Sequence, residues 1–423
     1  MLLPLLVSAV LSAPAAPPNV VIISIDTLRA DHLNFYGYRL DTAPALHDLS
    51  KRSLVFDDVV TEIPLTSPSF CAMMSSQYPR QTGATRNGLR LPDEVPTVAQ
   101  TFQSAGYETV CVTSNWTLKR KLSGLDRGFD VYNDSFHKKR WGFIKSERNA
   151  EEVTAIALEL LANRDAEKPL FAWFHYSDPH APYKKHRHFK VSSKSDYPKG
   201  RGRKVSVRYD SEIRKTDHFI EQVLEALPKE NTFLVFLADH GESLWEHDYL
   251  GHGRRIHQTG LHIPFMVSGP GIAPGRTDVP MRGIDVGTTV LGLAGLTVPE
   301  SMLGLDVVHG EVPMDRVRVV ETYGGAVPNF GVTRQIMADK PPQWQGVLLN
   351  GWKLITDGSE RELYRLTGDP METEDLSSDH PDKVEALLAL ITEWSARITS
   401  NKDNAAQLSE DDMDALESLG YIE

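Results

Sequence analysis

The sequence contains only two cysteines in 423 residues, Cys71 and Cys111. So few thiols exclude a small disulfide-rich scaffold, and a chain of this length buries enough apolar surface to fold without cross-links. Both cysteines stand in apolar stretches, where buried free thiols are the expected state. A single disulfide remains an alternative, since sequence does not tell whether the two side chains meet.

A surplus of positive charge is also missing, because the formal net charge is −12. Proteins that bind nucleic acids usually carry a basic surplus, so we expect no nucleic-acid partner. One segment departs from this balance and has two interpretations, a solvated and mobile insertion or a lid that attracts an anionic substrate. Its cations are Lys184, Lys185, Arg187, Lys190, Lys194, Lys199, Arg201, Arg203 and Lys204.

Long apolar runs are absent beyond the first residues, so we expect no membrane-spanning segment in the mature chain. Leu2 to Leu11 is apolar but short, and Ala13-Pro14-Ala15 places small residues at the spacing that signal peptidase reads. This pattern predicts a signal peptide over residues 1–15 and a secreted or periplasmic protein. The alternative is an apolar leader that stays attached.

What the sequence does have is the composition of an ordinary globular protein, with 41% hydrophobic and 24% charged residues. Apolar strand patterns alternate with amphipathic helix patterns, which predicts an α/β fold with a large, mostly parallel sheet sandwiched by helices. Leu54–Phe56 has the pattern of a buried parallel strand. The other predicted strands are Asn19–Asp26, Tyr107–Val112, Pro169–His175 and Asn231–Leu237, and the predicted helices are Thr97–Ala105, Glu147–Asn163 and Ser211–Leu227.

The pattern changes beyond Gly283. After a helix over Ile284–Ala294, short strand patterns and amphipathic helices predict a small C-terminal antiparallel sheet with terminal helices. We therefore expect a large α/β domain over residues 19–300 and a C-terminal subdomain over 301–423. The strands are predicted at Val317–Glu321, Gln345–Leu349 and Trp352–Thr356, and the helices at Val384–Ile398 and Asp411–Leu419.

Three polar positions follow predicted strands or open a predicted helix. Asp26 ends the first strand, Asp239-His240 follow another, and Thr66 stands just outside a helix start that Pro68 favours. Each alone has the simpler interpretation of a helix cap or turn. Together, two carboxylates, one imidazole and one hydroxyl suit a divalent cation that would activate the hydroxyl.

Two histidines fit around such a site. His180 lies between two prolines directly after a strand, and His252 lies between two glycines that let the backbone approach a ligand. Either imidazole could protonate a leaving oxygen or hold an anionic one. A structural role stays open for each, and we assign no role to His247 or His257.

Several motifs in order now resemble the sulfatase family within the alkaline phosphatase superfamily. The N-terminal motifs are Asn19–Asp26, Thr66–Ser69, Asp178–Pro182 and Asp239–Glu242. The resemblance continues through Gly351–Ile355, Glu362–Tyr364 and Gly368–Glu372 and covers nearly the whole mature chain. The fold that it implies is the alkaline phosphatase-like one, a large α/β domain with a small C-terminal sheet and helix.

Position by position, the resemblance implies a site. Asp26, Asp239 and His240 would bind one divalent metal, which could be calcium, manganese or zinc, and Thr66 would occupy the nucleophile position beside it. His180 would donate a proton to the leaving group. His252 falls near the place where relatives hold the anionic oxygens of the substrate with a Lys or a His.

The chain also departs from the family pattern. Sulfatases usually carry Cys or Ser where this chain has Thr66, because that residue is oxidised to formylglycine, and Thr cannot become that aldehyde. The related nucleotide pyrophosphatase/phosphodiesterases use an unmodified Thr. Phe70 stands where sulfatases commonly have Arg, and Asn115 replaces a frequent Lys as a polar, substrate-binding substitute.

These observations leave two classes of function. The first is a metal-dependent hydrolase of sulfate or phosphate esters, including a phosphodiesterase or phosphomonoesterase, with an unmodified Thr66 as nucleophile. The second is a binder without catalytic activity that recognises sulfated or phosphorylated glycans, which the loss of cations at Phe70 and Asn115 would favour. In both, the partner is an anionic group, carried in one interpretation on a carbohydrate.

Overall fold

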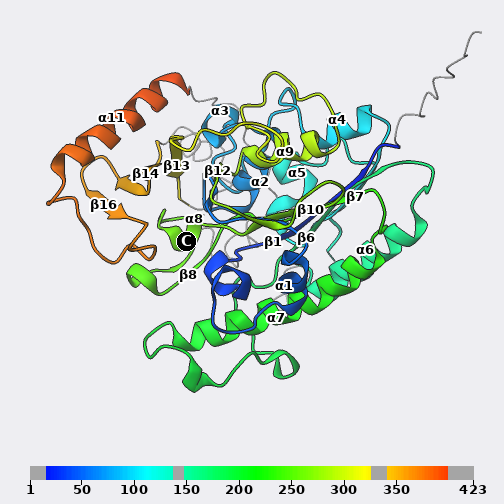
Figure 1. The fold of residues 1–423 in the computed structure, drawn as a ribbon, viewed down its shortest axis with the longest axis horizontal. Coiled ribbons are helices and arrows are strands. Elements are labelled where there is room, and N and C mark those ends of the chain that lie inside the picture. The colour runs from blue at the N-terminus through cyan, green and yellow to red at the C-terminus, as the bar shows by residue number, and fades with distance from the viewer. Residues whose placement is uncertain (1–15, 137–146, 325–340, 399–423) are drawn as a thin grey trace, which may run out of the picture.

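The computed structural model describes residues 16–136, 147–324 and 341–398. Its centre is an eight-stranded sheet in the order β11-β2-β10-β7-β1-β6-β4-β5, with helices on both faces (Figure 1). This arrangement confirms the predicted α/β fold. The predicted signal peptide over residues 1–15 and the predicted helix over Asp411–Leu419 lie outside the described residues.

Four neighbouring parallel strands form the middle of the sheet. They are β7 (Thr232–Ala238), β1 (Asn19–Ile25), β6 (Leu170–Tyr176) and β4 (Glu108–Val112). Nearly all of their residues are buried, which explains why they have continuous apolar runs rather than the alternation of a half-exposed strand. Because the strands are parallel, their carboxyl ends share one edge of the sheet.

The outer part of the sheet is mixed. β10 (Phe265–Ser268) runs antiparallel to both β7 and β2 (Leu54–Phe56). β2 pairs in parallel with the short β11 (Gly275–Thr277) and runs in the same direction as β7, so the prediction of a parallel strand is wrong only for its pairing with β10. A run of three apolar residues fits burial in either direction, so it carries no information on orientation. At the other edge, β5 (Val131–Asn133) is parallel to β4.

Helices cover the sheet in two layers. One contains α1 (Pro44–Ser50), α6 (Ala150–Asn163) and α7 (Arg203–Ala226), and the other contains α2 (Thr66–Ser75), α4 (Val98–Ser104) and α9 (Asp285–Leu293) (Figure 1). Side chains cap the starts of α4 and α6, at Thr97 and Asn149 respectively. Helix α7 begins well before the predicted Ser211, because its first turns continue the segment rich in Lys and Arg.

The C-terminal part is a four-stranded antiparallel sheet with a long helix against it. Alternate strand residues face α11 (Pro381–Arg397) and the large domain, so Val319 packs in the cluster that contains Trp394, while Val320 packs against Val60 and Leu261. This confirms the predicted small sheet and helix. Its strands are β13 (Arg318–Thr322), β14 (Trp344–Leu349), β15 (Trp352–Thr356) and β16 (Arg361–Arg365).

Cys71 in α2 and Cys111 in β4 are buried and free, which confirms the expectation of two free thiols. Within the described ranges, no helix is both long and apolar enough to cross a bilayer. The short elements are β3 (Val59–Val60), β8 (Ser243–Leu244), β9 (Leu250–Gly251), β12 (Met281–Arg282), α3 (Pro79–Thr82), α5 (Arg120–Ser123), α8 (Gln258–Leu261) and six 3-10 turns at Ala30–His32, Asn34–Tyr36, Trp116–Leu118, Arg187–Phe189, Lys194–Asp196 and Glu246–Asp248.

Candidate active site

The sheet edge formed by the four carboxyl ends gathers the predicted polar residues. Ile25 and Ala238 are paired in the register of β1 and β7, so Asp26 and Asp239 follow directly on neighbouring strands. His180 lies on the loop after β6, and Asn115 on the loop after β4. Their order along this edge follows the strand order, as expected for ligand sites in open α/β sheets.

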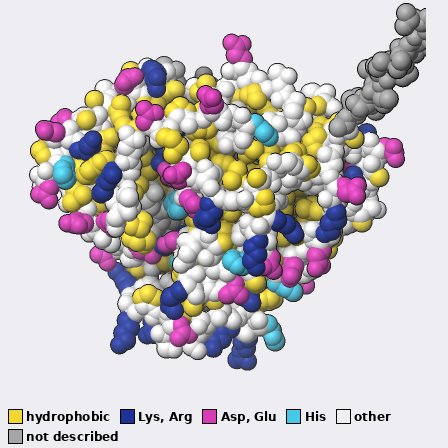
Figure 2. Space-filling model, in the orientation of Figure 1, with side chains coloured by type: hydrophobic (Ala, Val, Ile, Leu, Met, Phe, Trp, Pro, Cys, Tyr) yellow, Lys and Arg dark blue, Asp and Glu magenta, His cyan; other side chains and the backbone are white. Residues whose placement is uncertain are grey.

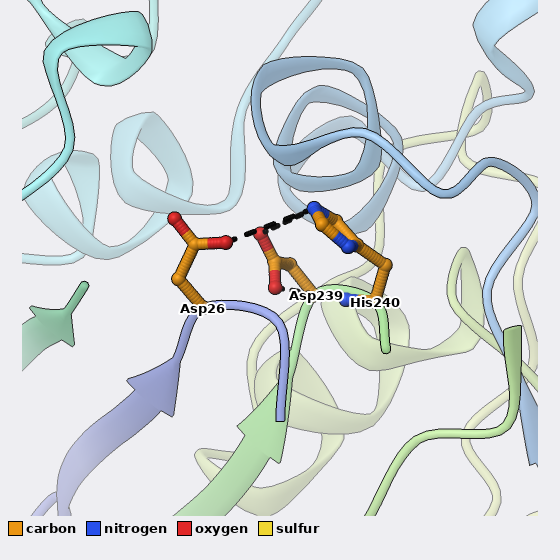
Figure 3. Close-up of side chains that lie close together, drawn as sticks. All are labelled: Asp26, Asp239 and His240. Atoms are coloured by element: carbon orange, nitrogen blue, oxygen red, sulfur yellow. Dashed lines mark hydrogen bonds and ion pairs between the residues drawn. The ribbon is translucent and has the colours of Figure 1, made fainter. Parts of the chain in front are cut away.

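Asp26, Asp239 and His240 form a compact cluster (Figure 3). The Nε2 atom of His240 lies 3.7 Å from Asp26 Oδ1 and 3.5 Å from Asp239 Oδ2. All three side chains are fully buried. One atom from each lies within 4.8 Å of the other two, which is the spacing of groups that can share one ion.

Burial makes the ionised forms of the two carboxylates costly. Burial, and then the charge of Asp239, raises the pKa of Asp26 to about 8, and burial raises the pKa of Asp239 to about 7. Asp239 Oδ1 accepts backbone N–H bonds from Thr27 and His240, but Asp239 Oδ2 is a buried oxygen with no donor among the described residues. Such an oxygen requires a cation or a proton.

His240 is oriented by its other ring nitrogen. Nδ1 lies 2.8 Å from the Gly241 carbonyl oxygen, which can only accept, so Nδ1 carries the hydrogen and Nε2 presents a lone pair to the two carboxylates. Burial, and then His252, lowers the pKa of His240 to about 4, which keeps the ring neutral. Two carboxylates and a neutral imidazole nitrogen therefore fit a divalent cation in charge and in atom type. Asp239 Oδ2, which has no donor among the described residues, could bind that cation.

The sequence predicted that Thr66 stands just outside a helix start. In the structure Thr66 is the first residue of α2. Leu65, whose backbone is extended, takes the cap position, and Pro68 becomes the third helical residue. The Thr66 hydroxyl oxygen lies 3.4 Å from Asp26 Oδ1 and 3.3 Å from His240 Nε2. The predicted nucleophile and the predicted metal ligands thus come together at the start of a buried helix.

The two predicted histidines complete the group. The ring of His252 lies 4.5 Å from that of His240 and 5.2 Å from that of His180, measured between centroids. Burial lowers the pKa of His252, but Glu242, with Asp26 and Asp239, outweighs burial and raises it. The Glu242 carboxylate lies 3.0 Å from His252 Nδ1 and so favours a cationic ring.

His180 Nδ1 lies 2.7 Å from the Ala181 carbonyl oxygen, so this nitrogen donates. That bond fixes the orientation of the imidazole ring. Asn115 has a different environment from the one expected of a substrate contact, because its amide Nδ2 donates to Asp26 Oδ2 and its Oδ1 accepts from the Thr117 backbone. Asn115 thereby holds Asp26 in position.

Sequence reasoning missed His175, which lies behind the site against Phe70. Phe70 is fully buried and packs with ring centroids 4.8 Å from Trp173 and 5.0 Å from His175. Burial, and then His240, lowers the pKa of His175 to about 3, and its Nε2 lies 3.9 Å from Asp26 Oδ2. The only signal in the sequence was a His in an otherwise apolar strand. In the structure His175 is paired with Ser24 on the neighbouring strand.

Sequence reasoning also missed Arg86 and Asn87. Asn87 Oδ1 accepts the backbone N–H of Ser67, next to Thr66, and Asn87 Nδ2 has no partner among the described residues. Arg86 is 1% exposed, donates from Nε to the Tyr323 carbonyl, and pairs with no carboxylate of the described chain. Burial lowers the pKa of Arg86 to about 10, so it remains a cation. Asn87 therefore presents a buried donor beside the start of α2, and Arg86, the preceding residue, is a buried cation beside Tyr323.

Comparisons with known proteins show the family of this chain. The family profile named Sulfatase matches residues 18–296. An ulvan-active sulfatase of Formosa agariphila is 25% identical over 363 residues, which cover 74% of this chain and 70% of that protein.

Solved structures show the same fold. One, a complex with D-glucosamine-2-N,6-O-disulfate, superposes with a TM-score of 0.74 at 18% identity, covering 93% of this chain and 100% of that one. A phosphonate monoester hydrolase from Silicibacter pomeroyi gives a TM-score of 0.69 at 18% identity, covering 93% and 100%. Because the family profile spans more than half of the residues, the chain belongs to the sulfatase family, whose members hydrolyse sulfate esters.

Proposed function

We propose that this chain is a metal-dependent hydrolase of sulfate esters carried on carbohydrates, with unmodified Thr66 as the attacking group. The observation that carries the proposal is the position of the Thr66 hydroxyl, 3.4 Å from Asp26 and 3.3 Å from His240 at a buried helix start. Free N–H groups and the positive dipole end of α2 favour an anion at that place.

The chain's own residues account for the bond changes. As the Thr66 hydroxyl gives its proton to water, its oxygen bonds to the sulfur atom while the bond from sulfur to the ester oxygen breaks. His180, protonated on both nitrogens, gives a proton to the departing oxygen. Neutral His180 then takes a proton from a water molecule that attacks the sulfur, and the Thr66 oxygen leaves and regains a proton. Sulfate and alcohol are released and the side chains are restored.

Other residues bind and orient the anionic group. His252, whose cationic form Glu242 favours, would contact the sulfate oxygens, and Arg86 and Asn87 would supply buried donors in place of the Arg that Phe70 replaces. Asp26, Asp239 and His240 would hold the metal, with Asn115 orienting Asp26. A divalent cation there would lower the pKa of the Thr66 hydroxyl and offset the negative charge of the ester.

The carbohydrate carrier is supported by relatives. The similar protein of Formosa agariphila is named as ulvan-active, and one structural neighbour is bound to a disulfated glucosamine. Export through the predicted signal peptide over residues 1–15 would bring the enzyme to such polymers outside the cytoplasm. We retain residues 19–300 as the proposed catalytic domain and 301–423 as its C-terminal subdomain.

A substrate panel tests the proposal. Purified protein with calcium, manganese or zinc is assayed on an aryl sulfate, a sulfated disaccharide, an aryl phosphate and a bis-aryl phosphate. We expect sulfate release that requires a metal and is lost in Thr66→Ala, with Thr66→Ser as the matched control that keeps a hydroxyl. Turnover that is unchanged in Thr66→Ala would exclude Thr66 as the nucleophile.

A second candidate is a phosphoric ester hydrolase, and the residue that favours it is Thr66 itself. An unmodified hydroxyl forms a phosphate ester that water can readily cleave, whereas the sulfatase cycle usually depends on an aldehyde that Thr cannot form. Turnover of phosphate mono- or diesters alone would select this candidate. Tight, metal-dependent binding of the sulfated disaccharide without any turnover would select the binder that lacks catalysis.

A further inference from the structure

The segment of residues 184–204, here called the basic lobe, projects from the molecule below α7 (Figure 1). Lys and Arg side chains gather on this lobe (Figure 2), and most of the nine that it contains are exposed. Its one acid, Asp196, accepts hydrogen bonds from Ser192 and Ser193. In a chain with a net charge of −12, this is a concentrated positive surface.

Both ends of the basic lobe are attached to residues around the active site. Tyr183, directly before it, has its ring centroid 6.0 Å from that of Tyr209, whose hydroxyl donates to the carbonyl of Thr27, the residue after Asp26. At the far end, a Cβ on Gly202 would lie 2.1 Å from the Leu244 carbonyl oxygen, so only glycine allows this contact. Leu244 is two residues beyond Glu242.

The stem of the lobe is tied down as well. The backbone N–H groups of Lys184 and His186 donate to Glu212 and Ser211 on α7, and the His186 ring lies 2.7 Å from the second Glu212 oxygen. Arg201 stacks 3.6 Å above the Trp245 ring centroid. These contacts hold the lobe at a fixed place beside the active site, in contrast to the loosely attached insertion that a charge run usually indicates.

We propose that the basic lobe binds the non-reacting anionic groups of a polyanionic polysaccharide while one of its sulfate esters occupies the active site. The inference rests on the proposed function for the identity of the polymer. Positive charge fixed next to a site raises the local concentration of an anionic ligand and adds contacts that a short substrate cannot make. A long polymer therefore gains from the lobe, and a small aryl ester does not.

The test compares two triple variants with equal loss of charge. Lys190→Gln, Lys194→Gln and Lys199→Gln remove three exposed cations of the lobe. Lys168→Gln, Lys229→Gln and Lys383→Gln remove three exposed cations elsewhere, and the first two precede β6 and β7 at the opposite edge of the sheet. Binding to immobilised dextran sulfate is measured against salt, and turnover is measured on the aryl ester and on a sulfated polymer.

We expect the lobe variant to bind dextran sulfate about tenfold more weakly, with a less steep salt dependence, because fewer counterions are released. Its KM for the polymer rises while kcat/KM for the aryl ester stays the same, and the control variant matches the wild type in every assay. Equal weakening in both triple variants, or none in the lobe variant, would overturn the proposal. So would duplex DNA that binds the lobe as tightly as dextran sulfate.

The two proposals fail in different ways. If no ester is turned over but the lobe variant still loses dextran sulfate binding, the proposed function fails and polymer binding by the lobe stands. If the aryl ester is turned over and both variants bind the polymer as the wild type does, the active site stands and the lobe proposal fails.

Discussion

Two sets of ionisable residues in this molecule are fully buried but differ in their charges. One pairs a cation with a carboxylate, and the other brings two carboxylates together. In the C-terminal part, Lys353 Nζ lies 2.6 Å from Glu372 Oε1 and donates to the Ile256 carbonyl, and Glu372 Oε2 accepts the backbone N–H of Gln258. At the sheet edge, Asp26 and Asp239 are buried to the same degree, but Asp239 Oδ2 has no donor within the described chain.

The difference separates a structural role from a functional one. A buried ion pair in which every polar atom has a hydrogen-bond partner joins parts of a fold. Here the pair links β15 to the segment before α8. The cluster at the sheet edge holds two buried carboxylates, one oxygen of which has no donor among the described residues, and such a cluster is a candidate ligand site. Each prediction below breaks one of these two sets or tests the distinction between them.

Removing the hydroxyl at the active site should have the largest effect. We expect Thr66→Ala to lower kcat/KM at least about 1,000-fold, since loss of a nucleophile removes bond formation itself. The free energy of unfolding should change by no more than about 1 kcal/mol, because no charge is stranded. Steady-state kinetics measures the loss of activity, and urea denaturation measures the change in stability. If Thr66→Ala kept an activity within a few-fold of that of Thr66→Ser, the assignment of Thr66 as nucleophile would be contradicted.

Breaking the balanced pair should harm stability rather than activity. Lys353→Met leaves the Glu372 charge buried without a cation and should cost about 3–5 kcal/mol of unfolding free energy. The double variant Lys353→Met/Glu372→Gln should recover most of that loss, because it removes the stranded charge. Urea denaturation measures both variants. If the single and double variants are equally unstable, packing rather than charge explains the loss.

Supplying and removing metal tests the unbalanced set. A divalent cation at about 100 times its dissociation constant should stabilise the wild type by about 3 kcal/mol, and a chelator should reverse this. Asp239→Asn should respond to neither, because it lacks one ligand charge. Thermal unfolding with and without metal is the measurement, and Lys353→Met, which should keep the full response, is the control.

Glu62 offers a third, intermediate case and the smallest effect. Burial raises its pKa to about 7 from 4.5, and its Oε2 atom has no donor among the described residues. The folded state therefore keeps a proton that the unfolded state has lost, so this group's contribution is complete below pH 4.5 and falls as pH rises toward 7.

Between pH 5 and pH 7 the wild type should lose about 2 kcal/mol through Glu62. Glu62→Gln cannot ionise, and its Oε1 can still accept the Ile284 N–H that Glu62 accepts now. Its unfolding free energy should accordingly fall less over this range. Urea titrations at several pH values compare the two proteins, and parallel pH profiles would show that Glu62 is ionised in the fold.

Much of this architecture could be predicted from local patterns. The apolar runs that end at Asp26 and before Asp239 predicted buried strands, and parallel pairing then required the two carboxylates to meet. The orientation of Leu54–Phe56 could not be predicted, because three apolar residues suit either direction. His175, Arg86 and Asn87 were missed because their importance comes from neighbours that are distant in sequence, such as Phe70 and Tyr323.

The sequence by itself determined which groups are available: a Thr where an aldehyde precursor usually stands, a Phe in place of an Arg, and a dense run of Lys and Arg. Only the tertiary structure decided their environment. Packing places these groups: burial, and then the charge of Asp239, raises the pKa of Asp26 to about 8. Among the described residues, Asp239 Oδ2 has no hydrogen-bond donor and buried Arg86 has no carboxylate partner. Composition cannot show such imbalances, because it counts charges without placing them.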